Sequence, residues 1–193
     1  MKKKERWIDL KFEIEPTDTH LTVKKTGRHG LGVFAVDSIS KGTLVTKLTG
    51  KRISTESLND LIRCGIIRND DPLQITSAEC LVLEGLSYYF NHSCDPNVGI
   101  KRESDLFALR DIPAGEEIRY DYSATVSPSN PLSDWIMECN CGSTDCRKVI
   151  THCLTLPVDR IAAYIKAGAF QEYMLRELSQ LSVLLRSVSR INQ

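Results

Sequence analysis

The chain has 193 residues, and its 25 lysines and arginines are balanced by 25 aspartates and glutamates, so the formal net charge is zero. Hydrophobic residues make up 41% and charged residues 26%, a composition typical of a globular chain that can build a core. Zero net charge argues against a broad electrostatic grip on nucleic acid, and no apolar run approaches the about 20 residues of a membrane-spanning helix. We expect one globular domain with an appended tail, without direct nucleic-acid binding and without a membrane anchor.

The start of the chain is basic but does not resemble a secretory signal, because no apolar stretch follows Met1–Arg6. We interpret these residues as a solvated terminus. The expected location is intracellular and cytoplasmic, with the nucleus or a host cell as alternative destinations.

Short strand-like runs separated by turn residues dominate the first part of the chain. The predicted strands are Leu21–Val23, Gly32–Val36, Thr43–Leu48, Cys80–Leu83, Leu106–Leu109 and Glu117–Tyr120. One short helix is predicted over Leu58–Ile67, with Ser54 and Thr55 as candidate caps. The expected fold class is mainly β with C-terminal α-helices.

One sequence pattern occurs twice. Phe34–Val45 matches Phe107–Ile118, and each copy predicts a strand, a turn that contains glycine, and a second strand. Nothing longer repeats, so the pattern favours two similar β-hairpin corners in one fold over an array of repeats.

The last third of the chain contains a loop and then helices. Residues 124–133 are rich in serine, proline and asparagine and predict a loop. Helical periodicity begins after Pro157, and Gly168 divides a short helix from a longer one. Apolar residues of the longer helix recur in steps of four and three at Met174, Leu178, Leu181, Leu185 and Val188. Two heptads are too few for a coiled coil, so we favour packing on the same domain, and a monomer, over dimerisation.

The seven cysteines are the most informative part of the composition. In a reducing compartment, metal ligation or burial as free thiols is favoured over disulfide formation. Three of them form the pattern Cys139-x-Cys141-x4-Cys146 in a polar segment, where a glycine lets the backbone fold back. Zinc takes four soft ligands in a tetrahedron, so the pattern predicts a structural zinc site with a fourth ligand from elsewhere. Spacing leaves Cys94, His152 and Cys153 as candidates.

Three further motifs can carry chemistry. The run Asn91–Cys94 follows three aromatic residues and can offer backbone and amide groups to a polar ligand. The loop Gly30–Gly32 precedes a strand, so it is not a dinucleotide-binding loop, although glycines let the backbone approach a ligand closely. Tyr120 and Tyr122 would share one face of a continuing strand, where they either pack in the core or line a narrow channel and orient an amine.

Together and in this order, the motifs resemble the SET-domain methyltransferases with a cysteine-rich post-SET segment. The matching segments are Gly30–Ala35, Asn91–Asn97, Gly115–Tyr122 and Cys139–Arg147. The resemblance implies a β-clip fold of small sheets in which the Asn-His segment threads under a loop as a pseudoknot. It divides the chain into an N-terminal extension (1–18), a SET domain (19–123), a loop and zinc-binding post-SET segment (124–156) and a C-terminal helical segment (157–193).

The resemblance also implies S-adenosylmethionine as methyl donor and assigns roles to individual residues. Tyr122 matches the catalytic tyrosine that orients the amine, and Tyr120 falls where a side chain influences how many methyl groups are added. The residues implied to hold the donor are Gly30, Leu31, Gly32, Asn91 and His92. The residues implied to hold the structural Zn²⁺ are Cys94, Cys139, Cys141 and Cys146.

The implied activity is transfer of a methyl group to a lysine ε-amine of a protein substrate, such as a histone or another basic protein. A tyrosine at position 120 favours monomethylation. One alternative is a methyltransferase for a small-molecule amine, because Leu48 and Tyr88 depart from residues common in the family. The other is a non-catalytic, zinc-stabilised interaction module, against which the retention of Asn91, His92 and Tyr122 argues.

Overall fold

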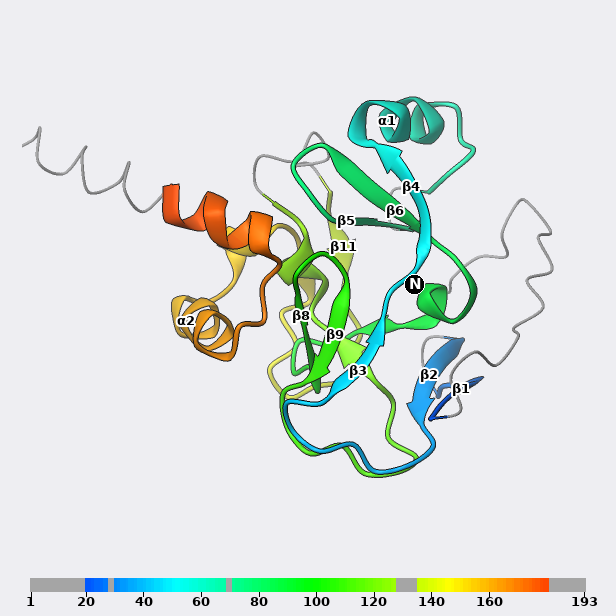
Figure 1. Cartoon of the computed structure of the whole chain (residues 1–193), viewed down its shortest axis with the longest axis vertical. Helices are drawn as coiled ribbons and strands as arrows, with labels where there is room; N and C mark the ends of the chain where they lie inside the picture. The colour runs from blue at the N-terminus through cyan, green and yellow to red at the C-terminus, as the bar shows by residue number, and fades with distance from the viewer. Residues whose placement is uncertain (1–19, 28–29, 69–70, 128–134, 181–193) are drawn as a thin grey trace, which may run out of the picture.

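The structure, a computed structural model, describes residues 20–27, 30–68, 71–127 and 135–180 (Figure 1). The predicted N-terminal extension, 1–18, therefore lies outside the described residues. The strands are β1 (Leu21–Lys25), β2 (Leu31–Ala35), β3 (Leu44–Lys47), β4 (Gly50–Ser54), β5 (Pro72–Gln74), β6 (Glu79–Leu83), β7 (Asn91–His92), β8 (Val98–Lys101), β9 (Asp105–Ala108), β10 (Arg119–Tyr120), β11 (Met137–Glu138) and β12 (Val149–Ile150). The α-helices are α1 (Thr55–Arg63) and α2 (Val158–Ala167), and residues 172–180 are also helical.

The strands form small sheets rather than one large one. Two sheets have three strands, in the orders β3-β9-β8 and β4-β6-β5, and the pairs β1-β2, β10-β7 and β11-β12 complete the set. The main core lies among these sheets and is built from apolar side chains that alternate along the strands. The prediction of a mainly β fold with C-terminal helices is confirmed.

The two copies of the repeated sequence pattern pair with each other. Ile39 and Ile112 occupy the same place in the two copies, and each donates its backbone N–H to the other's carbonyl at 2.8 Å. Gly42 donates to Ala108, and its counterpart Gly115 donates to Ala35, again at 2.8 Å in both cases. The two corners are therefore related by a local two-fold symmetry.

A parallel pair of very short strands brings distant motifs together. In the sheet β10-β7, Arg119 pairs with Asn91 and Tyr120 with His92. Parallel strands cannot be joined by a tight turn, so the chain between them must cross over. The intervening residues supply β8 and β9, which pair with each other in the neighbouring sheet. The pairing brings the Asn-His segment to the strand that precedes Tyr122, whereas its threading under a loop stays a prediction.

Local capping residues define both ends of the first helix, α1. Ser54 is the N-cap, and its side chain accepts a hydrogen bond from the Ser57 N–H at 3.1 Å. The helix ends at Arg63, and Gly65 adopts a left-handed φ of 71°. The predicted end at Ile67 was wrong because this glycine turn intervenes.

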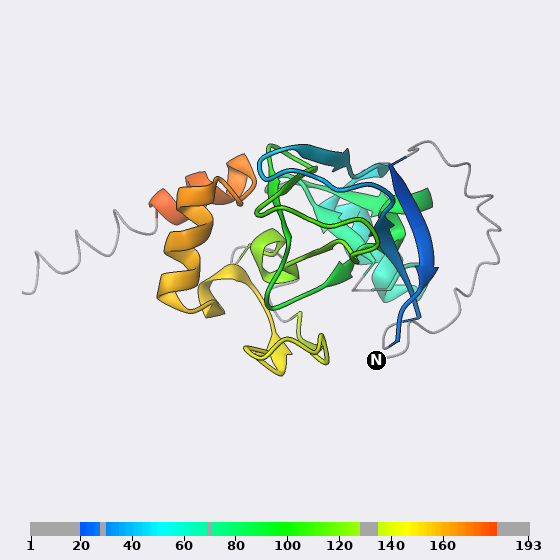
Figure 2. The same ribbon diagram turned by 90° about the horizontal axis from the view of Figure 1, so that it is seen from below.

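The C-terminal helices pack against the sheets on the side away from β1 and β2 (Figure 2). As predicted, α2 begins directly after Pro157 and ends at Gly168, which has a φ of 65°. Met174 is fully buried and Leu178 packs beside it in a second core cluster that includes Phe107 of β9. This part of the apolar stripe packs on the chain's own domain, whereas Leu181, Leu185 and Val188 lie outside the described residues. Among the described residues no helix has the length and hydropathy to cross a membrane.

Candidate active site and metal centre

The glycine loop and the asparagine of the Asn-His segment meet at one place. Asn91 Nδ2 donates to the Leu31 carbonyl at 3.0 Å and to Glu117 Oε1 at 2.7 Å. A Cβ atom on residue 32 would lie 2.8 Å from Asn91 Nδ2, so only glycine allows this close approach. The structure thus brings together Leu31, Gly32 and Asn91, which the sequence assigned to one site, and adds Glu117, which it did not.

The two tyrosines lie beside this cluster, but not on one continuing strand as predicted. Strand β10 ends at Tyr120, and a 3-10 turn, Tyr122–Thr125, begins two residues later. The rings are nevertheless neighbours, with centroids 4.8 Å apart and planes tilted by 47°. Tyr120 is buried, and burial raises the pKa of its phenol, which therefore stays protonated at neutral pH.

Hydrogen bonds fix Tyr122 on both of its ends. Its hydroxyl donates to the Phe90 carbonyl at 2.7 Å, and its backbone N–H donates to His92 Nδ1 at 3.2 Å. The ring of His92 also packs edge-on against Tyr122, with centroids 5.3 Å apart. The Asn-His segment and the tyrosine pair therefore form one connected site, which the parallel pairing of β7 with β10 assembles.

The chemistry of these groups fits S-adenosylmethionine, the donor that the resemblance implies. Both N–H groups of the Asn91 amide are directed to protein acceptors, so its carbonyl oxygen is the group that can accept from an ammonium. Gly30 adopts a left-handed φ of 79°, and the loop is closed by a 2.7 Å hydrogen bond from the Thr26 N–H to the Gly30 carbonyl. The loop can thus present backbone groups to a ligand at short range.

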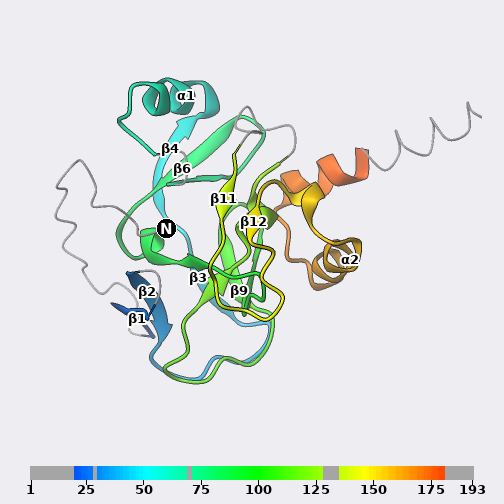
Figure 3. The same ribbon diagram turned by 180° about the vertical axis from the view of Figure 1, so that it is seen from behind.

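The predicted metal ligands converge on a second, adjoining site. Cys139 Sγ lies 3.7 Å from Cys94 Sγ and 3.6 Å from Cys146 Sγ. Zinc–sulfur bonds of about 2.3 Å at tetrahedral angles require sulfur atoms about 3.8 Å apart. Figure 3 shows this segment, between β11 and β12, lying across the face opposite to that of Figure 1. The spacing of the thiols fits one zinc ion.

Within the described residues, the ligand atoms of one group all lie within 4.8 Å of one another. Its members are His92, Cys94, Cys139 and Cys141, so three of the four predicted ligands are included, whereas Cys146 lies outside the group and contacts Cys139. Cys94 is thus placed in the cluster, and His92 joins it through Nε2, which lies 3.3 Å from Cys94 Sγ. Cys153, a candidate from spacing alone, is instead buried in the second core cluster beside the C-terminal helices.

The thiols differ in how readily they lose a proton. Burial raises the pKa of Cys94 and of Cys139. Burial also opposes ionisation of Cys141, but hydrogen bonds from the Cys94 backbone and from Ser143 outweigh it and lower the pKa to about 6. A thiolate at Cys141 is therefore present near neutral pH, and thiolates are the form that binds metal.

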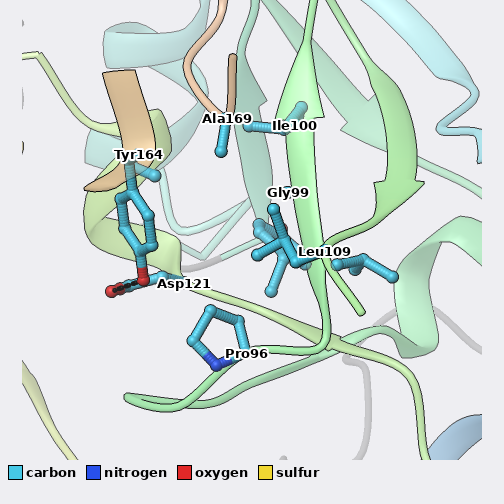
Figure 4. Close-up of a pocket in the computed structure, with 10 residues that line it drawn as sticks. Pro96, Gly99, Ile100, Leu109, Asp121, Tyr164 and Ala169 are labelled. Carbon is cyan, nitrogen blue, oxygen red and sulfur yellow. Dashed lines mark hydrogen bonds between the residues drawn. The ribbon is translucent and has the colours of Figure 1, made fainter. Parts of the chain in front are cut away.

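Two functional candidates were missed from the sequence, Asp121 and Tyr164. The buried carboxylate of Asp121 accepts a hydrogen bond from the Tyr164 hydroxyl at 3.0 Å (Figure 4). Both residues line a small, partly open pocket whose other walls are mainly apolar. An acidic residue between two tyrosines was the available signal for Asp121, whereas nothing in the sequence singled out Tyr164.

Comparison with known proteins agrees with this fold. Residues 30–123 match the family described as SET domain. This part of the chain therefore belongs to the SET-domain family.

Relatives of known name match over about two thirds of the chain. It is 30% identical over 146 residues to the variant-silencing SET domain-containing protein of Plasmodium falciparum, and 31% identical over 165 residues to an H3 lysine-9 specific histone-lysine N-methyltransferase of Fusarium mangiferae. It is 28% identical over 135 residues to the H3 lysine-4 specific histone-lysine N-methyltransferase of Saccharomyces cerevisiae. These matches cover 65%, 67% and 62% of the chain, but only 5%, 48% and 12% of the respective relatives.

Proposed function

We propose that the chain is an S-adenosylmethionine-dependent protein-lysine N-methyltransferase that adds mainly one methyl group. The observation that carries the proposal is the parallel pairing of β7 with β10, because it sets the Asn-His segment beside Tyr120 and brings His92 within hydrogen-bond distance of the Tyr122 N–H. Two of the named relatives are histone-lysine methyltransferases, which supports a lysine side chain as acceptor. We further propose an intracellular, basic protein such as a histone as substrate.

The proposed chemistry requires a neutral amine. A lysine ammonium must lose its proton near neutral pH, and desolvation by buried aromatic side chains depresses its pKa. When bound, S-adenosylmethionine would supply an electrophilic methyl group on a sulfonium. The amine nitrogen must then lie in line with that group at about 3–3.5 Å, and such alignment supplies much of the rate acceleration.

In this proposal the chain's own residues bind the methyl donor, orient the amine and exclude water. The Tyr122 hydroxyl donates its hydrogen to the Phe90 carbonyl, so its oxygen faces an amine as an acceptor and directs the nitrogen lone pair. Tyr120 is buried and narrows the space in which a methylated amine could turn, which favours a single addition. Asn91 and the loop Gly30–Gly32 would hold the donor.

The zinc site is proposed as structural. Cys94, Cys139, Cys141 and Cys146 would hold the ion, and no position is left open for a reacting ligand when four thiolates bind one zinc. The ion would order a segment with few apolar residues beside the tyrosines. His92 would then act on the thiolate of Cys94 rather than on the metal, through the 3.3 Å contact of its Nε2.

The test is methyl transfer from labelled S-adenosylmethionine to core histones, to a proteome and to a panel of small amines. We expect monomethyl-lysine on protein, detected by mass spectrometry. Tyr122→Phe should lower the rate by about 10²-fold because the amine is no longer oriented. Tyr120→Phe should increase the di- and trimethylated fractions. Tyr173→Phe, which removes a buried hydroxyl from the C-terminal helical region, is the matched control and should leave the rate unchanged.

Three results would contradict the proposal, each in its own way. Methyl transfer to small amines alone would show that the acceptor is a small molecule and not a protein lysine. Binding of the donor without transfer to any acceptor would identify a non-catalytic module. Transfer that survives Tyr122→Phe unchanged would remove the catalytic role of that residue.

A further inference from the structure

A buried carboxylate lies where three parts of the chain meet. Asp121 has 3% of its surface exposed and stands between the two tyrosines of the candidate site. Its Oδ1 accepts a hydrogen bond from Arg147 Nη2 at 2.6 Å, and its Oδ2 accepts one from the Tyr164 hydroxyl at 3.0 Å. Arg147 belongs to the cysteine-rich segment and Tyr164 to α2. One side chain thus joins the SET domain to both segments that follow it.

The carboxylate also determines the backbone that carries Tyr122. Asp121 is the N-cap of the 3-10 turn Tyr122–Thr125, and its Oδ1 accepts the Ser123 N–H at 3.0 Å. A buried charge is stable only where partners surround it, and removing a partner from a buried pair is strongly destabilising. The hydrogen-bond donors therefore set the position of the carboxylate, and the carboxylate sets the position of the turn that it caps.

The first donor connects this carboxylate to the cysteine cluster. The Arg147 backbone N–H donates to Cys94 Sγ at 3.4 Å, while the guanidinium of the same residue reaches Asp121. Its side chain is only 17% exposed, so this ion pair is shielded from solvent. Arg147 thus connects the cysteine segment to Asp121, and Asp121 in turn caps the turn that carries Tyr122.

The second donor comes from α2 through one hydroxyl group. In Figure 4 the Tyr164 side chain points from its helix to Asp121, past apolar residues that include Pro96, Leu109 and Ala169. The ring itself packs edge-on against Phe170, with centroids 5.8 Å apart, as a phenylalanine could also do. What tyrosine adds at this position is the hydrogen bond to Asp121.

We propose that Asp121 is a positioning residue for the pair Tyr120 and Tyr122, held from opposite sides by Arg147 and Tyr164. It contacts neither reactant and acts through the backbone of the turn that follows it. The kinetic consequence rests on the proposed methyltransferase function, whereas the positioning itself does not. The two are tested by separate measurements.

The first measurement needs no turnover. Tyrosine rings labelled with ¹³C are observed by NMR in the full chain, with Tyr120→Phe and Tyr122→Phe spectra to assign the two signals. Tyr164→Phe should shift both signals, because their rings depend on the carboxylate. Tyr173→Phe is the matched control, since it removes an equally buried hydroxyl that donates to the Thr125 carbonyl at 3.2 Å instead.

Two results of the NMR measurement would overturn the inference, whether or not the chain transfers methyl groups. One is a Tyr164→Phe spectrum in which neither signal moves. The other is an equal shift in the Tyr173→Phe control: because that hydroxyl donates to Thr125 at the far end of the same turn, the shift would show that loss of any helix contact to the turn moves the rings, without a special role for the carboxylate. A shift confined to Tyr164→Phe supports positioning even if the wild-type chain transfers no methyl group, in which case the proposed function fails alone.

The second measurement is a split of kcat and KM on the protein substrate found for the wild-type chain. Tyr164→Phe should lower kcat about tenfold and leave KM unchanged, because small displacements of a reacting geometry cost rate rather than binding. Asp121→Ala should cost about 10²-fold, and Asp121→Asn, which keeps the shape and an acceptor oxygen, should recover part of that loss. Equal effects of Asp121→Asn and Asp121→Ala, or a change confined to KM, would overturn the positioning role.

Discussion

At the scale of single residues, His92 connects the two candidate sites. Its Nδ1 accepts the Tyr122 N–H at 3.2 Å, so in the neutral imidazole the hydrogen resides on Nε2. That nitrogen lies 3.3 Å from Cys94 Sγ and is placed to donate to a thiolate there. One imidazole thus contacts the catalytic candidate Tyr122 through one nitrogen and a proposed metal ligand through the other. The same Nδ1 also lies 3.7 Å from Oδ1 of the buried Asp121 side chain.

A second residue-scale feature gives a pH-dependent prediction. Arg110 donates to Glu116, and these hydrogen bonds, with the arginine charge and an Asn97 amide, hold the pKa of Glu116 below its ordinary value. A depressed pKa adds stability that is complete above about pH 4.5 and is lost as the pH falls through the folded-state pKa. Glu116→Gln should therefore destabilise the chain at pH 7, by less than about 1 kcal/mol because Arg110 is half exposed.

Urea unfolding of the wild-type and Glu116→Gln chains at pH 7 and near pH 3 measures this difference. The two free energies of unfolding should converge at the lower pH. A gap that widens on acidification would contradict the assigned sign.

At the scale of elements, the cysteine-rich segment cannot fold by apolar burial alone. Its strands β11 and β12 have two residues each, and an isolated pair of that length is not stable in water. The local cluster consists of Trp135 and Ile150 with the thiols of Cys94, Cys139 and Cys141 themselves. Binding of a metal by such a segment contributes folding free energy directly.

The proposed zinc site predicts that zinc is lost when a ligand cysteine is replaced, but not when a cysteine outside the cluster is replaced. Cys141→Ser should abolish the zinc content, which we expect to be near one ion per chain, because a serine hydroxyl does not replace a thiolate. Cys64→Ser is the control, since Cys64 is an exposed thiol outside the cluster. Metal analysis of the purified variants decides the point. Equal zinc content in the two variants would contradict the site.

The elements also show what a sequence can and cannot predict. α2 was predicted because Pro157 and Gly168 mark its ends locally, and β2 because a short apolar run follows a glycine-rich turn. β10 lies within the predicted strand Glu117–Tyr120, but β7 has only two residues, too few for any periodic signal. Their pairing depends on residues far apart in the chain. The motifs could therefore be recognised, but not the contacts between them.

The same limit applies to the candidate site. The sequence indicated Asn91, Tyr122 and the cysteines because their types and spacings are distinctive. It did not indicate that the carboxylate of Asp121 meets Tyr164, because a hydrogen bond between residues in different elements leaves no local pattern. Metal ligation by the predicted cysteines stays a prediction, supported by the spacing of their sulfur atoms.

At the scale of the whole molecule, the C-terminal helices are joined to the sheets by close packing. Gly99 of β8 is the tightest point, because a Cβ atom there would lie 2.7 Å from Ala169 Cβ and 3.1 Å from Phe107 Cε1. Neighbours at these distances must move apart to accept a methyl group. The helices can approach the sheet this closely only because residue 99 has no side chain.

Gly99→Ala should therefore lower the free energy of unfolding by about 1–3 kcal/mol through overpacking. Gly27→Ala is the matched control, because nothing lies within 4 Å of its Cβ position. Urea denaturation of the two variants compares them directly. Equal free energies of unfolding for the two variants would show that the C-terminal region moves away from residue 99 without loss of stability.

The reciprocal pairing of the two corners is comparable to a homodimer interface contained in one polypeptide. Ile39 and Ile112 lie at its axis, and each corner completes the backbone hydrogen bonds of the other. The equivalence ends after Val45 in one copy and Ile118 in the other. The first copy continues into an ordinary strand, whereas the second continues to Tyr120, Asp121 and Tyr122. The shared pattern thus supports the architecture, whereas the proposed catalytic residues lie only in the extension of the second copy.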